Sequence, residues 1–356
     1  MEKLRDETLD NIILVIGNGF DIANGYQTRY GDFLSFTKSI YEKETPSNGN
    51  EARYKEIIEN NSFIKHFIDY KNKLDNWVDV EKEMYRIIKA IEYVFNDDSR
   101  HFKQVEFNPL IAIIDINTYE KKVLSEFGFT KGSNPQGYQI VSKDFYSNEY
   151  GIIWEAVNKE LENQLNGLKT ILIMYLKLFM EKKETQGSID CIKDLKPNHI
   201  ITFNYTDKYK GIYNCEDVNH VHGNLVDENI VLGYEDDNPK DLRYIKFKKY
   251  FQRIQNHLKP IDENIFDEHD PFIQSLFEET PEESKLNNIV HVYGMSLDKT
   301  DEDLIKKIYE KADKFMVYYL DNIDYENKVI NLIDIFTKDI VLKDQYNSKL
   351  VFEKIR

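Results

Sequence analysis

Four short segments of the chain hold residues whose types and spacing could do chemistry. The first is Ile16-Gly-Asn-Gly-Phe-Asp-Ile-Ala-Asn-Gly25, where two glycines would let the backbone approach a phosphate and a following helix would supply N–H donors. Neither the third glycine of the dinucleotide fingerprint nor the Lys-Ser or Lys-Thr pair of a P-loop stands at its place. Alone, this segment is equally well interpreted as a tight turn that binds nothing.

The second segment is Ile201-Thr-Phe-Asn-Tyr-Thr206, in which Asn204 follows a predicted parallel strand. Ligands of open α/β sheets bind at the carboxyl ends of the strands, so the Asn204 side chain could reach one. Asparagine is also a good helix N-cap, and from this segment alone capping of the next helix is the favoured interpretation.

The third segment is His220-Val-His-Gly-Asn224. Alternation along a strand would place His220 and His222 on one face, and Gly223 would open space beside His222. Imidazole titrates near neutral pH and is a common general base. No third ligand for a metal is evident from the spacing, and in isolation two structural histidines are the simplest interpretation.

The fourth segment is His291-Val-Tyr-Gly-Met-Ser-Leu297, with two aspartates downstream. It again combines a strand, a glycine turn and a helix, and Ser296 could either cap that helix or contact a ribose. A serine-hydrolase site is excluded because the second glycine of the nucleophile elbow is missing.

Each segment follows or ends a short apolar run, and such runs are typical of strands that a parallel sheet buries on both faces. The predicted strands are residues 11–16, 199–203, 218–221, 230–232, 288–293 and 315–320, with a weaker one at 340–342. The predicted helices lie within residues 51–95 and over 151–182, 244–258 and 301–311. Residues 110–114 fit either a strand or the end of a buried helix.

Strands that alternate with helices predict an α/β fold with a mostly parallel sheet. We expect the first strand and helix in residues 1–44, a mainly helical insertion or lid in residues 45–182, and the remainder of the α/β domain in residues 183–356. Because parallel strands end at the same edge of a sheet, the four segments can gather there. Trp77 and Glu81 would face that edge or the core of the insertion.

Composition narrows the possible partners. Acidic residues outnumber basic ones by 63 to 47 in the 356 residues, a formal charge of −16, so general nucleic-acid binding is not expected. Two cysteines, Cys191 and Cys215, cannot build a disulfide framework or a four-cysteine zinc module. The N-terminus is too charged for a signal peptide, and the most apolar stretch, residues 170–176, is far shorter than a ~20-residue membrane span. We therefore expect a cytoplasmic protein without membrane contact.

The order of the segments is more specific than any one of them. A strand with GNGFDIANG, then TFNYT, HVHGN and VYGMSLDKTDEDL resembles the AbiH family of bacterial abortive-infection proteins. The WVDVE sequence at residues 77–81 also looks like a tryptophan–acidic motif of that family. The resemblance implies defence against bacteriophage by stopping growth of the infected cell, with a phage-derived or host protein as a possible trigger.

The same order is similar to the sirtuin-like NAD-binding fold. Gly17, Gly19 and Gly25 match its first segment, with Asp21 where that pattern has serine and Gln27 where it has proline. This match implies a Rossmann-type sheet with a nucleotide at its carboxyl edge.

The later segments match the sirtuin-like pattern as well. Asn204 matches the asparagine of its Thr-Gln-Asn-Ile-Asp motif, although Thr206 stands in place of the aspartate. His222-Gly223 matches the catalytic His-Gly pair, and Gly294 and Ser296 match the Gly-x-Ser on the adenosine side. The zinc-binding cysteines of the deacylases are missing, so the resemblance implies hydrolysis of NAD to nicotinamide and ADP-ribose, with no metal.

The resemblance also implies roles for individual residues. Asn204 and His222 would be catalytic, Asn204 by orienting the ribose and water and His222 as the general base. His220 is expected to lie deeper and to hydrogen-bond within the fold. By analogy with other sirtuin-like effectors, we expect a homo-oligomer. The residues expected to bind the nucleotide are Gly17, Asn18, Gly19, Phe20, Asp21, Gly25, Thr206, Gly223, Gly294 and Ser296.

Two other classes of function stay open at this point. One is a nucleotide-sensing or protein-binding defence module that uses the same pocket without turnover, which Thr206 in place of aspartate favours. The other is a magnesium-dependent nuclease or nucleotide-processing enzyme that uses the acidic loops, and the strongly acidic charge disfavours a nuclease.

Overall fold

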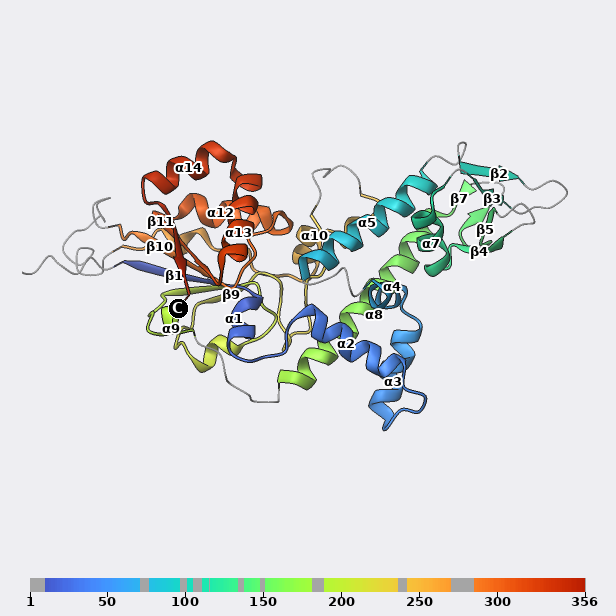
Figure 1. Cartoon of the computed structure of the whole chain (residues 1–356), viewed down its shortest axis with the longest axis horizontal. Helices are drawn as coiled ribbons and strands as arrows, with labels where there is room; N and C mark the ends of the chain where they lie inside the picture. The colour runs from blue at the N-terminus through green and yellow to red at the C-terminus, as the bar shows by residue number, and fades with distance from the viewer. Residues whose placement is uncertain are drawn as a thin grey trace, which may run out of the picture. The chain divides into compact units, whose positions relative to one another are not determined.

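The computed structural model describes residues 10–70, 77–96, 101–104, 111–114, 116–133, 138–147, 151–180, 189–235, 242–269 and 285–355. The chain divides into two compact units (Figure 1). The α/β unit consists of Met1–Thr28, Phe179–Val231 and Arg253–Arg356, and the helical unit consists of Arg29–Leu178 and Leu232–Gln252.

A six-stranded sheet of parallel strands forms the centre of the α/β unit, in the order β12-β11-β10-β1-β8-β9. Counted along the chain within this sheet, the order is 6-5-4-1-2-3, which is that of the Rossmann fold. The predicted α/β fold with a mostly parallel sheet is therefore confirmed. The strands are β1 (Asn11–Ile16), β8 (His199–Thr202), β9 (Val218–His220), β10 (Asn288–Tyr293), β11 (Lys314–Tyr319) and β12 (Leu350–Lys354).

The central strand β1 is covered on both faces, as its uninterrupted apolar run predicts. Ile13 and Val15 pack in one hydrophobic cluster, while Leu14 and Ile16 pack in the other. The first cluster includes residues of α12 (Glu302–Lys311), α13 (Asn322–Phe336) and α14 (Lys338–Tyr346). The second includes residues of α1 (Asn18–Ala23), α9 (Asp190–Lys193) and the 3-10 helix η2 (Lys208–Gly211).

The strand register brings all four sequence segments to one edge of the sheet. Ile16, the last residue of β1, pairs with Thr202 of β8 on one side and with Tyr293 of β10 on the other. Because all three strands are parallel, the residues that follow them emerge at the same carboxyl edge, at the point where the strand order reverses.

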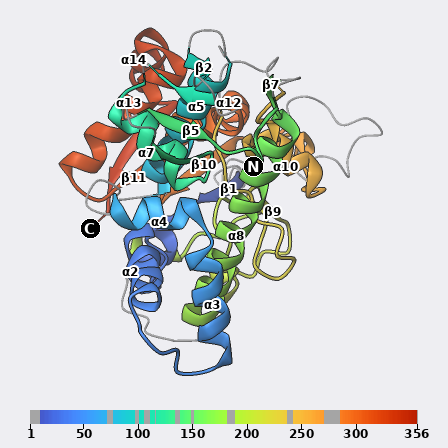
Figure 2. The ribbon, with the colours of Figure 1, turned by 90° about the vertical axis from the view of Figure 1, so that its right-hand side faces the viewer.

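Among the residues of the helical unit that the structure describes, six helices make up most of the ordered elements, and Figure 2 labels them. The long helix α8 packs against the junction of α3 and α4, where the Asn61 side chain donates to the Gln164 carbonyl at 2.6 Å. The helices are α2 (Tyr30–Tyr41), α3 (Gly49–Glu59), α4 (Ser62–Asp69), α5 (Trp77–Phe95), α7 (Thr118–Glu126) and α8 (Trp154–Met180). The unit also contains two small antiparallel sheets. One has the strand order β2 (Phe102–Gln104), β3 (Ile111–Ile113), β5 (Gln139–Val141) and β4 (Thr130–Ser133), and the other pairs β6 (Tyr146–Ser147) with β7 (Gly151–Ile152).

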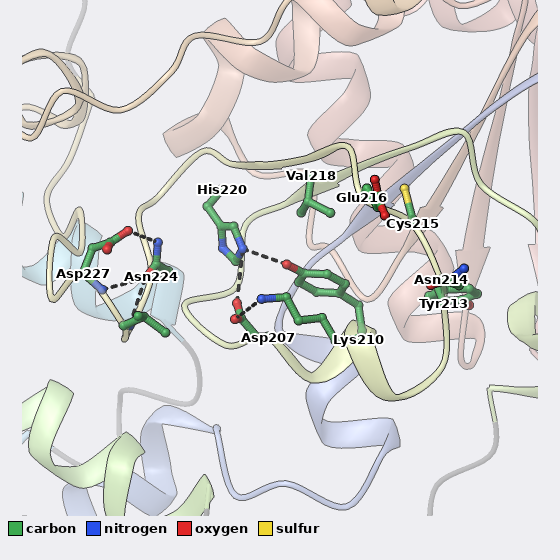
Figure 3. Close-up of a pocket in the computed structure, with 12 residues that line it drawn as sticks. Asp207, Lys210, Tyr213, Asn214, Cys215, Glu216, Val218, His220, Asn224 and Asp227 are labelled. Atoms are coloured by element: carbon green, nitrogen blue, oxygen red, sulfur yellow. Dashed lines mark hydrogen bonds and ion pairs between the residues drawn. The ribbon is translucent and has the colours of Figure 1, made fainter.

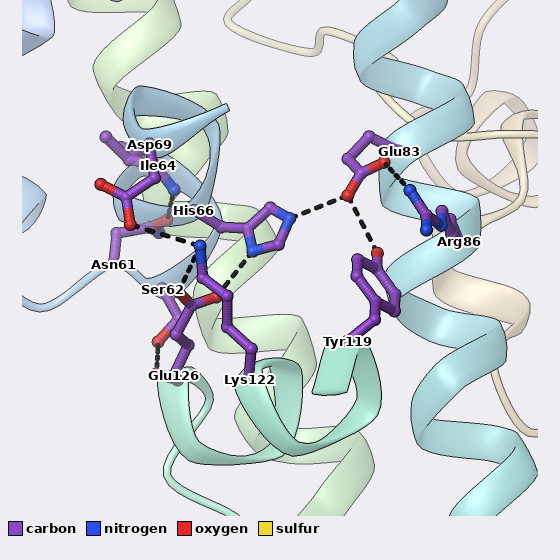
Figure 4. A network of polar contacts seen from close by, with 10 residues as sticks. All are labelled: Asn61, Ser62, Ile64, His66, Asp69, Glu83, Arg86, Tyr119, Lys122 and Glu126. Atoms are coloured by element: carbon purple, nitrogen blue, oxygen red, sulfur yellow. Dashed lines mark hydrogen bonds and ion pairs between the residues drawn. The ribbon is translucent and has the colours of Figure 1, made fainter. Parts of the chain in front are cut away.

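His66 ties three helices of this unit together (Figure 4). Its Nδ1 lies 2.6 Å from Glu126 Oε2 on α7, and its Nε2 lies 2.8 Å from Glu83 Oε1 on α5. Both ring nitrogens of this fully buried side chain face carboxylate oxygens, an arrangement that favours the doubly protonated imidazolium. Burial alone would lower the pKa of His66, but the two carboxylates outweigh it and raise this pKa. The ring also stacks on Tyr70, with centroids 4.5 Å apart.

Several predicted elements differ from the structure. Residues 230–232 are buried but belong to no strand, and residues 340–342 lie in α14, where a single buried side chain, Val341, contacts the core. The helix expected over 244–258 is a 3-10 turn, η3 (Ile245–Phe247), followed by α10 (Lys249–Gln255).

The units divide at Thr28 and Phe179 rather than at residues 44 and 182, and residues 232–252 return to the helical unit. Among the described helices, none combines the length and apolar character of a membrane span.

Candidate functional site

Two glycine turns cross closely at the carboxyl edge of the sheet. The Gly19 N–H donates to the Gly294 carbonyl at 2.8 Å, and a Cβ on Gly19 would lie 2.6 Å from the Gly294 Cα. Gly294 has φ +72°, and a Cβ there would lie 2.4 Å from the Phe20 nitrogen. Glycine is therefore required at both positions by the contact of one backbone with the other.

This packing changes the expected role of the first segment. The N–H groups of Gly17, Gly19 and Phe20 donate to the carbonyls of Tyr293, Gly294 and Gly17, respectively. The sequence predicted that the Gly17–Gly19 turn would donate to a pyrophosphate. These three N–H groups instead donate within the protein. Phe20 is fully buried in the core.

The two remaining positions of the first segment have local roles. The Asn18 side chain donates to the Thr28 carbonyl at 3.1 Å. Gly25 has φ +80°, and its N–H donates to the Ile22 carbonyl as the chain leaves α1. Both interactions shape the turn that follows α1.

Behind the turns, Asp21, Asn204 and Thr206 form a buried polar cluster. Asp21 is 1% exposed, and its Oδ2 accepts the Thr206 hydroxyl at 2.7 Å. The Asn204 side chain donates to the Gly17 carbonyl at 3.0 Å, so it links the end of β8 to the end of β1. Asn204 thus makes a tertiary contact at the carboxyl end of β8 instead of capping the next helix.

The Asp21 carboxyl has an unusual protonation equilibrium. Burial raises its pKa to about 7, against the opposing effects of the Thr206 hydroxyl, the charge of Lys208 and the Asn204 amide. Within the part of the chain that the structure describes, its Oδ1 has no hydrogen-bond partner. A carboxyl that titrates near neutral pH can act as an acid or a base and can control its neighbours.

His222 contacts Asp301, a residue that the sequence did not link to it. Strand β9 ends at His220, so His222 lies in the following turn, and the expectation that both imidazoles share one strand face is wrong. His222 Nε2 lies 2.9 Å from Asp301 Oδ1, and its ring stands edge-on to Phe203, with centroids 5.2 Å apart. Arg253 approaches the same carboxylate at 3.7 Å. A carboxylate so placed fixes the ring and its tautomer.

His220 lines an open pocket of about 590 Å³ beside β9 (Figure 3). Its Nε2 lies 3.0 Å from the Tyr209 hydroxyl and 3.3 Å from Asp207 Oδ1, and Asp207 also binds Lys210 at 2.6 Å. Burial lowers the pKa of His220, although Asp207 opposes this effect. The expectation that His220 lies deeper than His222 is wrong, since the His220 side chain is 15% exposed and that of His222 is 8%.

Gly223 makes room for protein rather than for a ligand. It has φ +76°, and a Cβ there would lie 2.2 Å from the Asn229 carbonyl oxygen. The next contact along this turn is between the Val231 N–H and the His222 carbonyl at 2.8 Å. The turn that carries His222 is therefore fixed from both sides, and the predicted space beside it is filled.

The fourth segment contributes Gly294 to the two crossing glycine turns, and Asp301, downstream of the segment, contacts His222. Ser296 does not cap a helix: its carbonyl accepts the Asn331 side chain at 2.9 Å, and Asp298 is the residue whose side chain caps η6 (Lys299–Asp301). Among the residues that the structure describes, no group of three or more histidine, cysteine or carboxylate side chains is placed to hold a metal ion.

In the helical unit, Glu81 of the predicted tryptophan–acidic motif is buried and lies 2.9 Å from the buried Lys249 Nζ. Helix α5 begins at Trp77, before Asp79, so Asp79 lies in its first turn. The sequence singled out Glu81 but not its cationic partner, which is 168 positions further along the chain.

A family model described as "Bacteriophage abortive infection AbiH" matches residues 13–319. The match runs from β1 to the end of β11 and includes the four segments and the whole of the helical unit. No curated protein and no solved structure matches the chain.

Proposed function

The chain belongs to the AbiH family of bacteriophage abortive infection proteins, and we propose that it acts in phage defence by hydrolysing NAD to nicotinamide and ADP-ribose. One observation carries the proposal: Asn204, Asp21 and the His222 imidazole all follow neighbouring parallel strands of one sheet. In Rossmann-type sheets, nucleotides bind outside this carboxyl edge.

In the proposed reaction, the bond between ribose C1′ and the nicotinamide nitrogen breaks, and its electron pair leaves with nicotinamide. A water oxygen forms the new bond to C1′, and its proton passes to His222. The transition state resembles an oxocarbenium ion, and neutral nicotinamide leaves without strong acid assistance. The chain must therefore position water and ribose more than it must supply acid.

Three side chains divide this work. Asn204 orients the ribose hydroxyls and the attacking water. His222 accepts the proton as a general base, and Asp301 holds its imidazole through the 2.9 Å contact, as a carboxylate does for a catalytic histidine. Gly294 and Ser296 would lie on the adenosine side. Since the N–H groups of Gly17 and Gly19 donate within the protein, these two glycines would form a wall of the site and would not donate to its phosphates.

The test is to incubate the purified protein with NAD, NADP and ATP, with and without magnesium, and to separate the products by chromatography. We expect nicotinamide and ADP-ribose from NAD without magnesium. His222→Ala and Asn204→Ala should each lower NAD turnover by about two to four orders of magnitude, with circular dichroism showing that each variant is folded. His220→Ala, the control, should mainly lower stability. If His222→Ala consumes NAD at the parental rate, the mechanism is wrong.

A second candidate is a module that binds a nucleotide without turnover, which the internally bonded glycine turn favours. Binding of NAD without any product would support it, and products that appear only with magnesium would indicate nucleotide processing instead. We also propose that the protein is a homo-oligomer, which light scattering tests: a monomer at all concentrations would contradict this.

A further inference from the structure

The hydrogen bond between Asp21 and Thr206 is a polar link between two strand ends that are far apart in the sequence. Asp21 lies on α1 after β1, and Thr206 follows β8, yet the carboxyl and hydroxyl oxygens are 2.7 Å apart. Asp21 is 1% and Thr206 is 3% exposed, so water does not compete for this bond. When Asp21 is ionised, the Thr206 hydroxyl must therefore be the donor of this bond.

The charged and titratable groups around Asp21 are few. Among the described residues that affect it, Lys208 is the one cation, and its Nζ lies 4.5 Å from the centre of the Tyr26 ring. Burial, and then the charge of Asp21, raise the pKa of Tyr26, so this phenol stays neutral near pH 7. The nearby Asn204 amide is uncharged. Asp21 is thus the group of this cluster that changes charge around neutral pH, since its own pKa is raised to about 7 by burial.

The two protonation states of Asp21 leave Thr206 with different hydrogen-bonding capacity. An ionised carboxylate only accepts, so the Thr206 hydroxyl must donate to it, and the Thr206 oxygen can then only accept from a third group. A protonated carboxyl can donate to Thr206, which frees the hydroxyl proton to turn elsewhere.

We propose that Asp21 is a positioning residue that orients the Thr206 hydroxyl. When Asp21 is ionised, the Thr206 oxygen accepts a hydrogen bond from a hydroxyl group of the bound ribose, and the protein binds this ribose more tightly. The inference rests on the proposed function for the identity of the ligand. It assigns Thr206 as the ligand contact and Asp21 as the group that controls its direction through the 2.7 Å bond. Binding of a ribose-containing ligand should therefore strengthen as the pH rises through the range in which Asp21 ionises.

The first experiment measures binding of ADP-ribose by calorimetry at pH 6 and pH 8. The wild-type protein should bind about tenfold more tightly at pH 8, the effect of one hydrogen bond whose acceptor becomes properly oriented. Asp21→Asn should bind with the same affinity at both pH values, because an amide does not ionise. Thr206→Ser should keep the wild-type pH dependence, and Thr206→Val should lose it.

Asp344→Asn is the matched control. Asp344 also accepts a hydroxyl, that of Tyr309 at 2.8 Å, but it lies on α14 in a different part of the α/β unit from the strand-end cluster. This variant should keep the tenfold change. Equal wild-type affinity at pH 6 and pH 8, or a change that persists in Asp21→Asn, would overturn the proposal.

A measurement on the ligand-free protein separates this inference from the proposed function. The amide resonances of Asn204 and Thr206 should titrate together with a midpoint near pH 7 in the wild type, and should not do so in Asp21→Asn. If this titration is seen but ADP-ribose fails to bind at any pH, the proposed function and the ligand assignment fall while the positioning role stands. If the titration is absent, the positioning role falls.

Discussion

Replacement of His66 by leucine should destabilise the helical unit, most strongly at low pH. In the wild type the imidazolium lies between Glu83 and Glu126, and its removal leaves two carboxylates facing an apolar group. Breaking a buried ion pair by removing one partner costs about 3–5 kcal/mol. Glu126 is 22% exposed, and Glu83 keeps the Tyr119 hydroxyl at 2.9 Å, so we expect the lower end, about 3 kcal/mol at pH 6.

The pH dependence follows from the direction of the shift. The two carboxylates raise the pKa of His66 in the folded protein, against the effect of burial. A raised pKa contributes stability that is complete below the unfolded value, about 6.5, and is lost as the pH rises through the folded value. The unfolding free energy of the wild type should therefore fall above pH 6.5, and that of His66→Leu should lack this fall. The two proteins should differ less at pH 9 than at pH 6.

Tryptophan fluorescence reports this effect selectively. The chain has two tryptophans, Trp77 and Trp154, and both belong to the helical unit. For a unit of this size each kcal/mol shifts the melting temperature by about 2–4 °C, so His66→Leu should melt about 6–12 °C lower at pH 6.

His101→Leu is the matched control. His101 is also fully buried in the helical unit, and its ring nitrogen Nδ1 lies 3.3 Å from the Ile114 carbonyl oxygen rather than against a carboxylate. This variant should lose stability because a buried side chain is replaced, and it removes no contact with a carboxylate. If His66→Leu follows the wild-type pH dependence in parallel from pH 6 to pH 9, the imidazolium bridge does not contribute as described.

Two further variants test the α/β unit. Gly19→Ala should lower the unfolding free energy by about 2–3 kcal/mol in circular dichroism melts, because its Cβ would lie 2.6 Å from the Gly294 Cα. Gly211→Ala in the same unit is the control, since a Cβ there meets nothing within 4 Å, and equal melting of both variants would contradict the close crossing. Burial and the charge of Lys314 lower the pKa of His291 to about 4. Below pH 6.5 the unfolded chain takes up a proton at this residue and the folded protein does not, so the unfolding free energy falls as the pH falls. His291→Gln should therefore lose about 1 kcal/mol less than the wild type between pH 6.5 and 5.5 in urea titrations, and an unchanged loss would count against this reasoning.

The strands that lie inside the sheet could be predicted from the sequence because their environment leaves a local signal. β1 and β10 were predicted with the bounds that the structure has, since strands covered on both faces are uninterrupted apolar runs. The edge strand β12, with the sequence Leu-Val-Phe-Glu-Lys354, was not predicted because only its first residue is buried and charge interrupts the run. Helix α13 was missed for a similar reason: exposed isoleucines such as Ile323 and Ile330 blur its periodicity.

The candidate site could be predicted only as far as each segment reaches by itself. Asn204 was found because it directly follows a strand. Its contact with Gly17, and that of His222 with Asp301, depend on strand order, which local sequence does not encode. The acidic residues after the fourth segment were noticed, but no periodicity could assign one of them to a histidine 79 residues away.

The position of β1 at the centre of the sheet has a consequence for synthesis of the chain. Both of its neighbours come late, since β8 begins at His199 and β10 at Asn288. At translation rates of about 5–20 residues per second, β1 waits roughly 10–40 s for its first partner. Most of the helical unit is one continuous stretch, Arg29–Leu178, which can fold during this interval. The nascent chain thus carries an unpaired apolar strand ahead of a folded unit, and occupation of that strand by a chaperone would delay assembly of the α/β unit until β8 has emerged.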